Sequence, residues 1–225
     1  MKETAERLMD LAEAHIRNAG YAGFSFRALA AEIGIKSATV HHHFPTKATM
    51  TAAVARRYAD RFFAAVARRP NETAEDAIAA YRSTFKAALD RDGLMCLFGV
   101  LGVEAGGLSP EIANEILSFF RRCVEDLSQR IGGLDAEARA FQVIATLEGG
   151  MMLARAYRPL PASYSPRRAH KDEKWHKIEV DDVAATDLHN RLAKQIVSQI
   201  APSSSNRSKA PRHGRRALPD RSQRS

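Results

Sequence analysis

Cysteine, long hydrophobic runs and a targeting signal are scarce or missing in this chain, and each shortage argues against a class of protein. Two cysteines among 225 residues, Cys96 and Cys123, are too few for a disulfide framework or a four-cysteine metal site. The longest apolar run, residues 94–103, is shorter than the about 20 residues that span a bilayer. The N-terminal segment MKETAERLMDL lacks the apolar stretch of a secretory signal. We therefore expect a cytoplasmic protein that makes no use of a membrane.

Motifs of the common enzyme classes are also missing. The sequence has no GxSxG elbow, Walker loop, HExxH pair or dinucleotide-binding glycine fingerprint. Several carboxylates occur at helical spacings, but none is paired in an obvious apolar pocket. We predict no catalytic residue and no cofactor. A hydrophobic content of 45% is ordinary for a folded domain, so the chain can bury a core.

Charge is distributed unevenly along the chain. Residues 1–69 hold 11 Lys and Arg against 6 Asp and Glu, whereas residues 70–155 hold 8 against 13. Residues 203–225 hold 7 against 1 in a low-complexity segment that we expect to be disordered. A basic N-terminal part joined to an acidic part is expected if only the first meets phosphate.

Residues 25–47 read SFRALAAEIGIKSATVHHHFPTK and predict a helix, a tight turn, a second helix and a stop. Ser25 can cap the first helix, and Gly34 supplies the positive φ that a sharp corner needs. Ser37 can cap the second helix, which Pro45 ends. Two short helices joined by such a turn form the DNA-binding helix-turn-helix, whose second helix enters the major groove.

Several residues around this motif also occur at fixed spacings. They are Gly20, Tyr21, Ser25, Arg27, Leu29, Ala30, Ile33, Gly34, Ile35, His43, Phe44, Pro45 and Lys47. With them, residues 6–66 resemble the DNA-binding domain of the TetR/AcrR family of bacterial transcription regulators. The resemblance implies double-stranded operator DNA as a partner and a homodimer formed through the last two helices. His41 departs from the pattern, because the family usually has an aromatic residue there.

The candidate DNA contacts lie on and around the second short helix. Val40 and Phe44 are expected to face the core, which leaves the opposite side for the groove. Lys36 and Lys47 bracket this helix and can bind backbone phosphates, and the resemblance implies the same role for Arg27. The candidate DNA-binding residues are Ser25, Arg27, Lys36, Ser37, Thr39, His41, His42, His43 and Lys47.

The consecutive histidines His41, His42 and His43 raise the question of a metal site. Neighbouring helical residues diverge by about 100°, so three in a row do not converge on one ion. We therefore predict no metal. Contact with the groove or with phosphate is expected for at least one of the three, with packing as the alternative for His43.

Helical periodicity extends through the rest of the chain, and no strand pattern occurs. The predicted fold class is all-α, with an N-terminal helix-turn-helix domain and a C-terminal helical effector-binding and dimerisation domain. The expected domains are residues 1–69, including a linker helix at 47–69, residues 70–200, and a disordered basic tail at 201–225.

Start and stop signals give approximate helix boundaries. Thr4 is expected to cap the first helix and Thr46 the linker helix, Thr73 with Asp76 resembles a capping box, and Pro110 begins a long helix. The inward stripe of that long helix is Ile112, Ile116, Phe120, Cys123, Leu127 and Ile131. Asp135 is expected to cap the next helix, which carries Phe141, Ile144, Glu148, Met151 and Met152. Residues 94–104 are expected to form a short buried helix, residues 159–176 a loop, and residues 183–200 a further helix.

An effector pocket is expected in the helical body, because a domain built only for dimerisation would not need its additional amphipathic layer. Cys96 is either a small buried hydrophobe or an effector-sensing thiol, whereas Cys123 is expected in the core. The segment LMCLFGVLGVE, with LSPEI after it, resembles a NemR-like and AcuR-like branch of the family, which implies an electrophile or a short unsaturated acid as effector. The candidate pocket residues are Tyr81, Phe85, Cys96, Phe98, Phe120 and Met151.

Together these features predict a ligand-responsive transcriptional regulator, a repressor that binds a palindromic operator as a dimer and is released by a small molecule. Gly149 and Gly150 lie within a predicted helix, which indicates either close helix packing at the dimer two-fold or a kink. The alternative function is a helical ligand-binding or interaction protein that no longer binds specific DNA. Intact Arg27, Lys36 and Lys47 favour the regulator.

Overall fold

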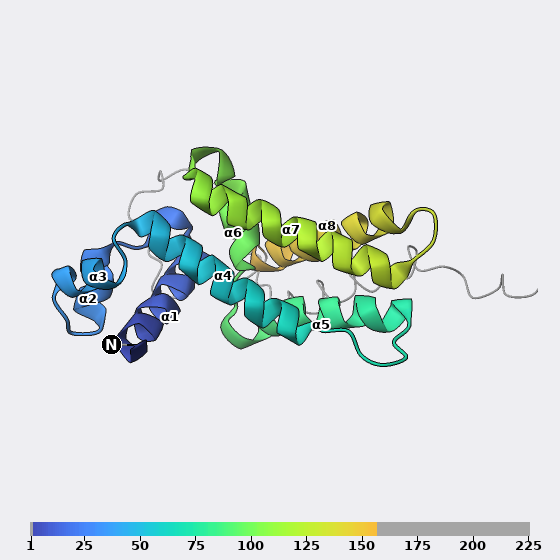
Figure 1. The fold of residues 1–225 in the computed structure, drawn as a ribbon, viewed down its shortest axis with the longest axis horizontal. Helices are drawn as coiled ribbons and strands as arrows, with labels where there is room; N and C mark the ends of the chain where they lie inside the picture. The colour runs from blue at the N-terminus through green and yellow to red at the C-terminus, as the bar shows by residue number, and fades with distance from the viewer. Residues whose placement is uncertain (1, 157–225) are drawn as a thin grey trace, which may run out of the picture.

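A computed structural model describes residues 2–156 of the chain, and these residues form helices, turns and loops without any strand. The loop at 159–176, the helix at 183–200 and the tail at 201–225 that the sequence predicts lie outside the described residues. Figure 1 shows α2 and α3 at one end of the molecule and α5, α7 and α8 toward the other, with α4 running between them. The helices are α1 (Lys2–Ala19), α2 (Phe26–Glu32), α3 (Ser37–His43), α4 (Lys47–Ala65), α5 (Ala74–Asp92), α6 (Leu97–Val103), α7 (Pro110–Ile131) and α8 (Ala136–Ala156).

The N-terminal helices follow the predicted caps and turn, with two differences. The Ser25 hydroxyl accepts a hydrogen bond from the Ala28 N–H, and Gly34 has φ 73° between α2 and α3. The prediction for Ser37 is wrong by one position, because Lys36 is the N-cap residue and has no side-chain cap bond. The prediction for Thr4 is also wrong, since α1 already begins at Lys2.

The long fourth helix has a defined beginning and ends earlier than predicted. Thr46 forms a capping box with Thr49, as the cap signal after Pro45 indicates. The predicted helix 47–69 is four residues too long, because α4 ends at Ala65. The Arg130 guanidinium donates to the Val66 carbonyl at 2.7 Å, so the helix terminus has a tertiary partner that local sequence does not reveal.

The α5–α7 region shows how tertiary contacts shift helix boundaries. The predicted capping box of Thr73 with Asp76 and the stop at Gly93, where φ is 62°, are both confirmed. The predicted short helix 94–104 begins instead at Leu97. Arg17 from α1 donates to the Leu94 carbonyl at 3.4 Å and to the Met95 carbonyl at 2.8 Å, which holds this stretch outside the helix.

An aromatic core joins α4, α5, α6 and α7. The rings of Phe98 and Phe119 stack at 3.9 Å, and Phe62 makes edge contacts with Tyr81, Phe85 and Phe119. The prediction that Phe120 belongs to the inward stripe of α7 is wrong by one position, because Phe119 is 2% exposed and Phe120 is partly buried. A 3.6-residue period leaves such neighbours ambiguous until packing decides between them.

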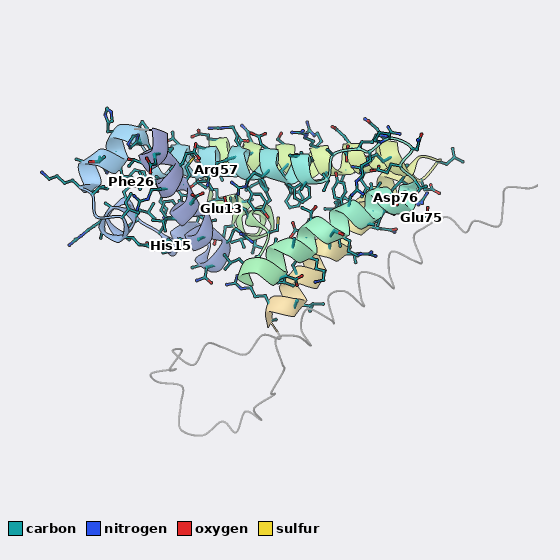
Figure 2. All side chains as sticks on the ribbon, turned by 90° about the horizontal axis from the view of Figure 1, so that it is seen from below. Glu13, His15, Phe26, Arg57, Glu75 and Asp76 are labelled. Carbon is teal, nitrogen blue, oxygen red and sulfur yellow. The ribbon has the colours of Figure 1, made fainter. Side chains whose placement is uncertain are left out.

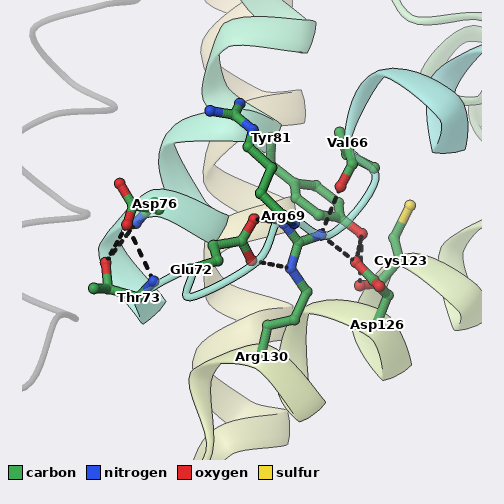
Figure 3. A network of polar contacts seen from close by, with 9 residues as sticks. All are labelled: Val66, Arg69, Glu72, Thr73, Asp76, Tyr81, Cys123, Asp126 and Arg130. Carbon is green, nitrogen blue, oxygen red and sulfur yellow. Dashed lines mark hydrogen bonds and ion pairs between the residues drawn. The ribbon is translucent and has the colours of Figure 1, made fainter.

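A buried ionic network fastens this core beside the α4 terminus (Figure 3). Arg130 donates to both carboxylate oxygens of Glu72, at 2.8 and 2.9 Å, and to Asp126 at 2.8 Å. The side chains of Arg130 and Glu72 are each 2% exposed. The Arg130 hydrogen bond lowers the pKa of Glu72, so the carboxylate stays ionised.

Helix α8 is buried on one side and exposed on the other. Of the residues that the sequence places on it, Ile144 and Met151 are buried, whereas Phe141 is 64% and Met152 56% exposed. The helices that pack against α8 are α7 and, to a lesser extent, α5. Val103, predicted within a buried helix, is also exposed.

Candidate nucleic-acid interface and effector cavity

Helix α3 presents its polar side outward. Val40 is fully buried and Phe44 nearly so, as the sequence predicts, and they seat α3 against α1 and α2. His41 and His42 are exposed, and Thr39 is half-buried. Among the other candidates, Ser25, Arg27 and Lys36 are exposed, while Ser37, His43 and Lys47 are half-buried. This arrangement leaves one side of a short helix available to a groove.

His41 has a fixed orientation that the sequence did not reveal. Its ring meets the ring of Phe26, the first residue of α2, edge-on at 4.8 Å. His43 has ring contacts with His42 at 5.7 Å and with Phe44 at 6.5 Å. No cluster of metal-binding side chains occurs within residues 2–156. In the sequence, the aromatic residue Phe26 directly after the Ser25 cap is the one feature that could have indicated this contact.

Lys47 plays a structural part in the N-terminal domain. Its ammonium donates to the Phe24 carbonyl at 2.7 Å and lies 4.5 Å from the ring centres of Tyr21 and Phe24. Burial lowers the pKa of Lys47, and the charge of Glu104 acts in the opposite direction. Contact between Lys47 and phosphate therefore stays a prediction, and any such contact competes with the Phe24 carbonyl.

Ion pairs fix the helix-turn-helix domain to α4 (Figure 2). Arg57 of α4 donates to Glu6 and Asp10 of α1, each at 2.8 Å, and Arg61 donates to Glu13 at 2.5 Å. Figure 2 shows Arg57 beside Glu13, and the two side chains lie 3.5 Å apart. His15 of α1 lies 2.9 Å from Glu32 of α2. Movement of α4 would thus carry α1 and the recognition helix with it.

A cavity of about 430 Å³ lies between α6, α7 and α8. Of the predicted pocket residues, only Phe98 and Phe120 line it. Tyr81 and Phe85 are fully buried in the aromatic core instead. The lining consists of Met95, Phe98, Gly99, Gly102, Val103, Phe120, Val124, Phe141, Ile144, Ala145, Glu148, Gly149 and Met152.

Cys96 lies behind this cavity and is 1% exposed. Burial raises the pKa of its thiol well above the ordinary value, and the nearby Glu148 carboxylate raises it further. The thiolate is the reactive form of cysteine, so this environment disfavours attack on an electrophile. Cys123 is fully buried, and burial also raises its pKa. The predicted core placement of Cys123 is confirmed.

Glu148 is the functional group that the sequence reasoning passed over. The sequence places it on the same helix side as Ile144 and Met151, but it was not singled out as a site residue. Both of its carboxylate oxygens are buried without a hydrogen-bond partner in the described part of the chain. Burial raises the pKa of Glu148 to about 7. The sequence feature that could have identified Glu148 is a single acidic residue between Ile144 and Met151 on an apolar side of a helix.

Several hydrogen bonds join the cavity walls to the DNA-binding end. Glu104, which follows α6, accepts a hydrogen bond from the Tyr21 N–H at 2.9 Å. Arg155 of α8 donates to the Arg17 carbonyl at 2.9 Å and to the Asn18 carbonyl at 2.5 Å. Two walls of the cavity, α6 and α8, therefore both bond directly to the end of α1 and the turn after it.

The geometry defines a class of protein: a helix-turn-helix DNA-binding regulator with a helical C-terminal body. A sequence profile described as bacterial regulatory proteins of the tetR family matches residues 8–54, which cover α1 to the first half of α4. Among proteins with curated descriptions, none matches this chain significantly.

Solved structures of the same architecture extend the likeness over most of the chain. A TetR transcriptional regulator from Legionella pneumophila is 26% identical, with a TM-score of 0.64, covering 84% of this chain and 95% of that one. A TetR-family regulator from Agrobacterium tumefaciens is 20% identical, with a TM-score of 0.71, covering 89% and 99%. Reduced NemR from E. coli is 16% identical, with a TM-score of 0.64, covering 87% and 96%, and this shows the fold alone.

Residues 8–54 therefore match the DNA-binding domain of the TetR family, and the chain is similar over most of its length to TetR-family transcriptional regulators. Proteins of the TetR family are DNA-binding regulators and not enzymes. No helix in the described range is both long and apolar enough to cross a membrane.

Proposed function

We propose that the protein is a ligand-responsive repressor that binds a near-palindromic operator as a homodimer. The observation that carries this proposal is a recognition helix with an exposed polar side, on a basic domain bonded directly to the walls of a cavity. A single short helix reads few bases, so two half-sites about 34–36 Å apart, or somewhat more, are expected. Arg27 and Lys36 would position α3 through phosphate contacts, and His41 and His42 would face the bases.

The proposed dimer uses the uncovered side of α8. Leu153, Phe141 and Met152 are apolar and exposed there. Phe141 and Met152 also line the cavity between α6, α7 and α8, so a partner helix on this side would cover part of the cavity's open side. A Cβ added at Gly149 would meet nothing within 4 Å, so this part of α8 is open to close approach by a second helix. An apolar helix face of this kind is a typical interface between copies of one chain.

Ligand control follows from the contacts between the cavity and the N-terminal DNA-binding domain. A ligand changes DNA affinity only if it binds more tightly to a dimer with one spacing of the two DNA-binding domains than to a dimer with another spacing. A molecule that separates α6 from α8 would shift the Glu104 bond to Tyr21 and the Arg155 bonds to α1. Because Cys96 is buried with a raised pKa, reversible binding is a better account of release than attack by an electrophile.

The test is a gel-shift titration with DNA flanking the protein's own gene, at several salt concentrations and with competitor DNA. Protection of two related half-sites by a dimer would support the proposal, with light scattering to establish the oligomeric state. Equal affinity for all sequences would favour the alternative, a helical ligand-binding or interaction protein that no longer binds specific DNA. Binding of one half-site by a monomer would refute the dimer.

A further inference from the structure

Glu148 is the one ionisable residue among the described residues that line the cavity between α6, α7 and α8. Neither carboxylate oxygen is exposed, and no hydrogen-bond partner for either exists within residues 2–156. The group beside the carboxylate is the Cys96 thiol, which is a weak donor. A buried carboxylate in this condition is unfavourable unless a partner supplies N–H groups or a positive charge.

The described residues around Glu148 leave space for its carboxylate but provide no positive charge to pair with it. A methyl group added at Gly99 would overlap Glu148, so the glycine of α6 makes room for the acid. Burial raises the pKa of Glu148, the adjacent Cys96 thiol is the only opposing cause, and no cation contributes. The site therefore has space and a negative group, while the positive counterpart is missing from the described residues.

The remaining lining gives the site a strongly apolar character. Phe98 of α6, Phe120 of α7 and Ile144 of α8 contribute walls from three helices. The volume of about 430 Å³ lies within the range of small-molecule sites. A few convergent polar groups in an otherwise apolar cavity are what fix the orientation of a ligand in such sites.

We propose that this cavity binds a small molecule with an apolar, ring-sized body and a protonated amine, and that the Glu148 carboxylate turns from Gly99 toward the cavity to accept hydrogen bonds from the amine. The ammonium supplies both the donors and the positive charge that the carboxylate lacks, while the body displaces water from Phe98, Phe120 and Ile144. A ligand carrying a carboxylate would place two acids together, so the short unsaturated acid that the sequence suggested is disfavoured. The consequence for DNA rests on the proposed function, but the binding itself does not.

The test uses three probes of similar size with the full-length protein in calorimetry at pH 7. The probes are 4-phenylbutylamine, the neutral 4-phenylbutan-1-ol and the anionic 5-phenylpentanoate. The amine is expected to bind at least about tenfold more tightly than the alcohol, and the pentanoate more weakly than either. Glu148→Gln should abolish the preference for the amine, whereas Glu125→Gln, a change at an exposed position of α7, should preserve it.

A second measurement needs no variant. At pH 6 Glu148 is mostly protonated, so pairing with an ammonium should release about one proton, and at pH 8 almost none. Calorimetry in two buffers with different ionisation enthalpies measures this number. Equal binding of amine and alcohol, no binding of any probe at millimolar concentration, or no proton release at pH 6 would each overturn the proposal.

The outcomes also separate this inference from the proposed function. Tight amine binding that leaves operator affinity unchanged would uphold the amine site and refute control of DNA through this cavity. Release of operator by a compound other than an amine, together with no amine binding, would uphold the regulator and overturn the amine site.

Discussion

Replacing the buried Glu148 carboxyl by the neutral amide of glutamine should stabilise the protein increasingly as pH rises. The pKa of Glu148 is about 7 in the fold against 4.5 ordinarily, so the folded state resists ionisation that the unfolded chain permits. The stability present below pH 4.5 is therefore lost as pH rises toward 7. Between pH 5 and pH 8 the wild type should lose about 2–3 kcal/mol of unfolding free energy relative to Glu148→Gln.

Urea unfolding of both proteins at pH 5 and pH 8, at one protein concentration, measures this difference. Groups that titrate identically in both proteins cancel in the comparison. The neighbouring Tyr58, Cys96 and Cys123 have raised pKa values and stay neutral in this range. Glu125→Gln should show a difference that is nearly independent of pH. A constant difference for Glu148→Gln as well would mean that water or a basic group reaches the carboxylate, and would remove the basis of the amine site.

Three other substitutions or truncations test separate parts of the molecule. Arg130→Ala should lower the free energy of unfolding by about 3–5 kcal/mol, because it leaves the Glu72 carboxylate buried without its partner. Urea unfolding measures this loss, with Arg121→Ala, a change at an exposed position of α7, as the control. Lys47→Ala should weaken DNA binding on all sequences and reduce the salt slope by about one, and should also lower the Tm through loss of the Phe24 contact; an unchanged slope with lost discrimination would assign Lys47 to base contacts. Deleting residues 203–225 should reduce non-specific DNA affinity without changing the preferred sequence, since the segment holds 7 basic residues against 1 acidic; unchanged non-specific affinity would show that these residues do not contact DNA.

A further prediction concerns the thiol. Cys96→Ser should bind operator like the wild type and should still be released by the natural effector, because the buried thiol has a raised pKa. Fluorescence anisotropy of labelled operator measures both. Failure of release in this variant alone, together with release of the wild type by N-ethylmaleimide, would restore the electrophile sensor that the sequence left open.

Local sequence determined the elements whose causes are local. Ser25, Thr46 and Thr73 cap their helices because the hydroxyl of an extended N-cap residue lies within reach of the backbone N–H three residues later. Gly34 and Gly93 end or turn helices because only glycine adopts a positive φ without strain. The all-α class, the helix-turn-helix and the family resemblance all follow from such short-range patterns.

Tertiary structure decided those helix boundaries, core positions and burial that depend on contacts with residues distant in the sequence. At the end of α4 the Val66 carbonyl accepts a hydrogen bond from Arg130, 64 positions away in the sequence. Just before α6 the Met95 carbonyl accepts one from Arg17, 78 positions away. Phe119 rather than Phe120 faces the core because Phe98 stacks on it. Glu148 reads in the sequence as one acid on an apolar stripe. Only the packing of α6 and α7 against α8 buries its carboxylate beside a cavity, because desolvation comes from all neighbours together and not from the helix that bears the residue.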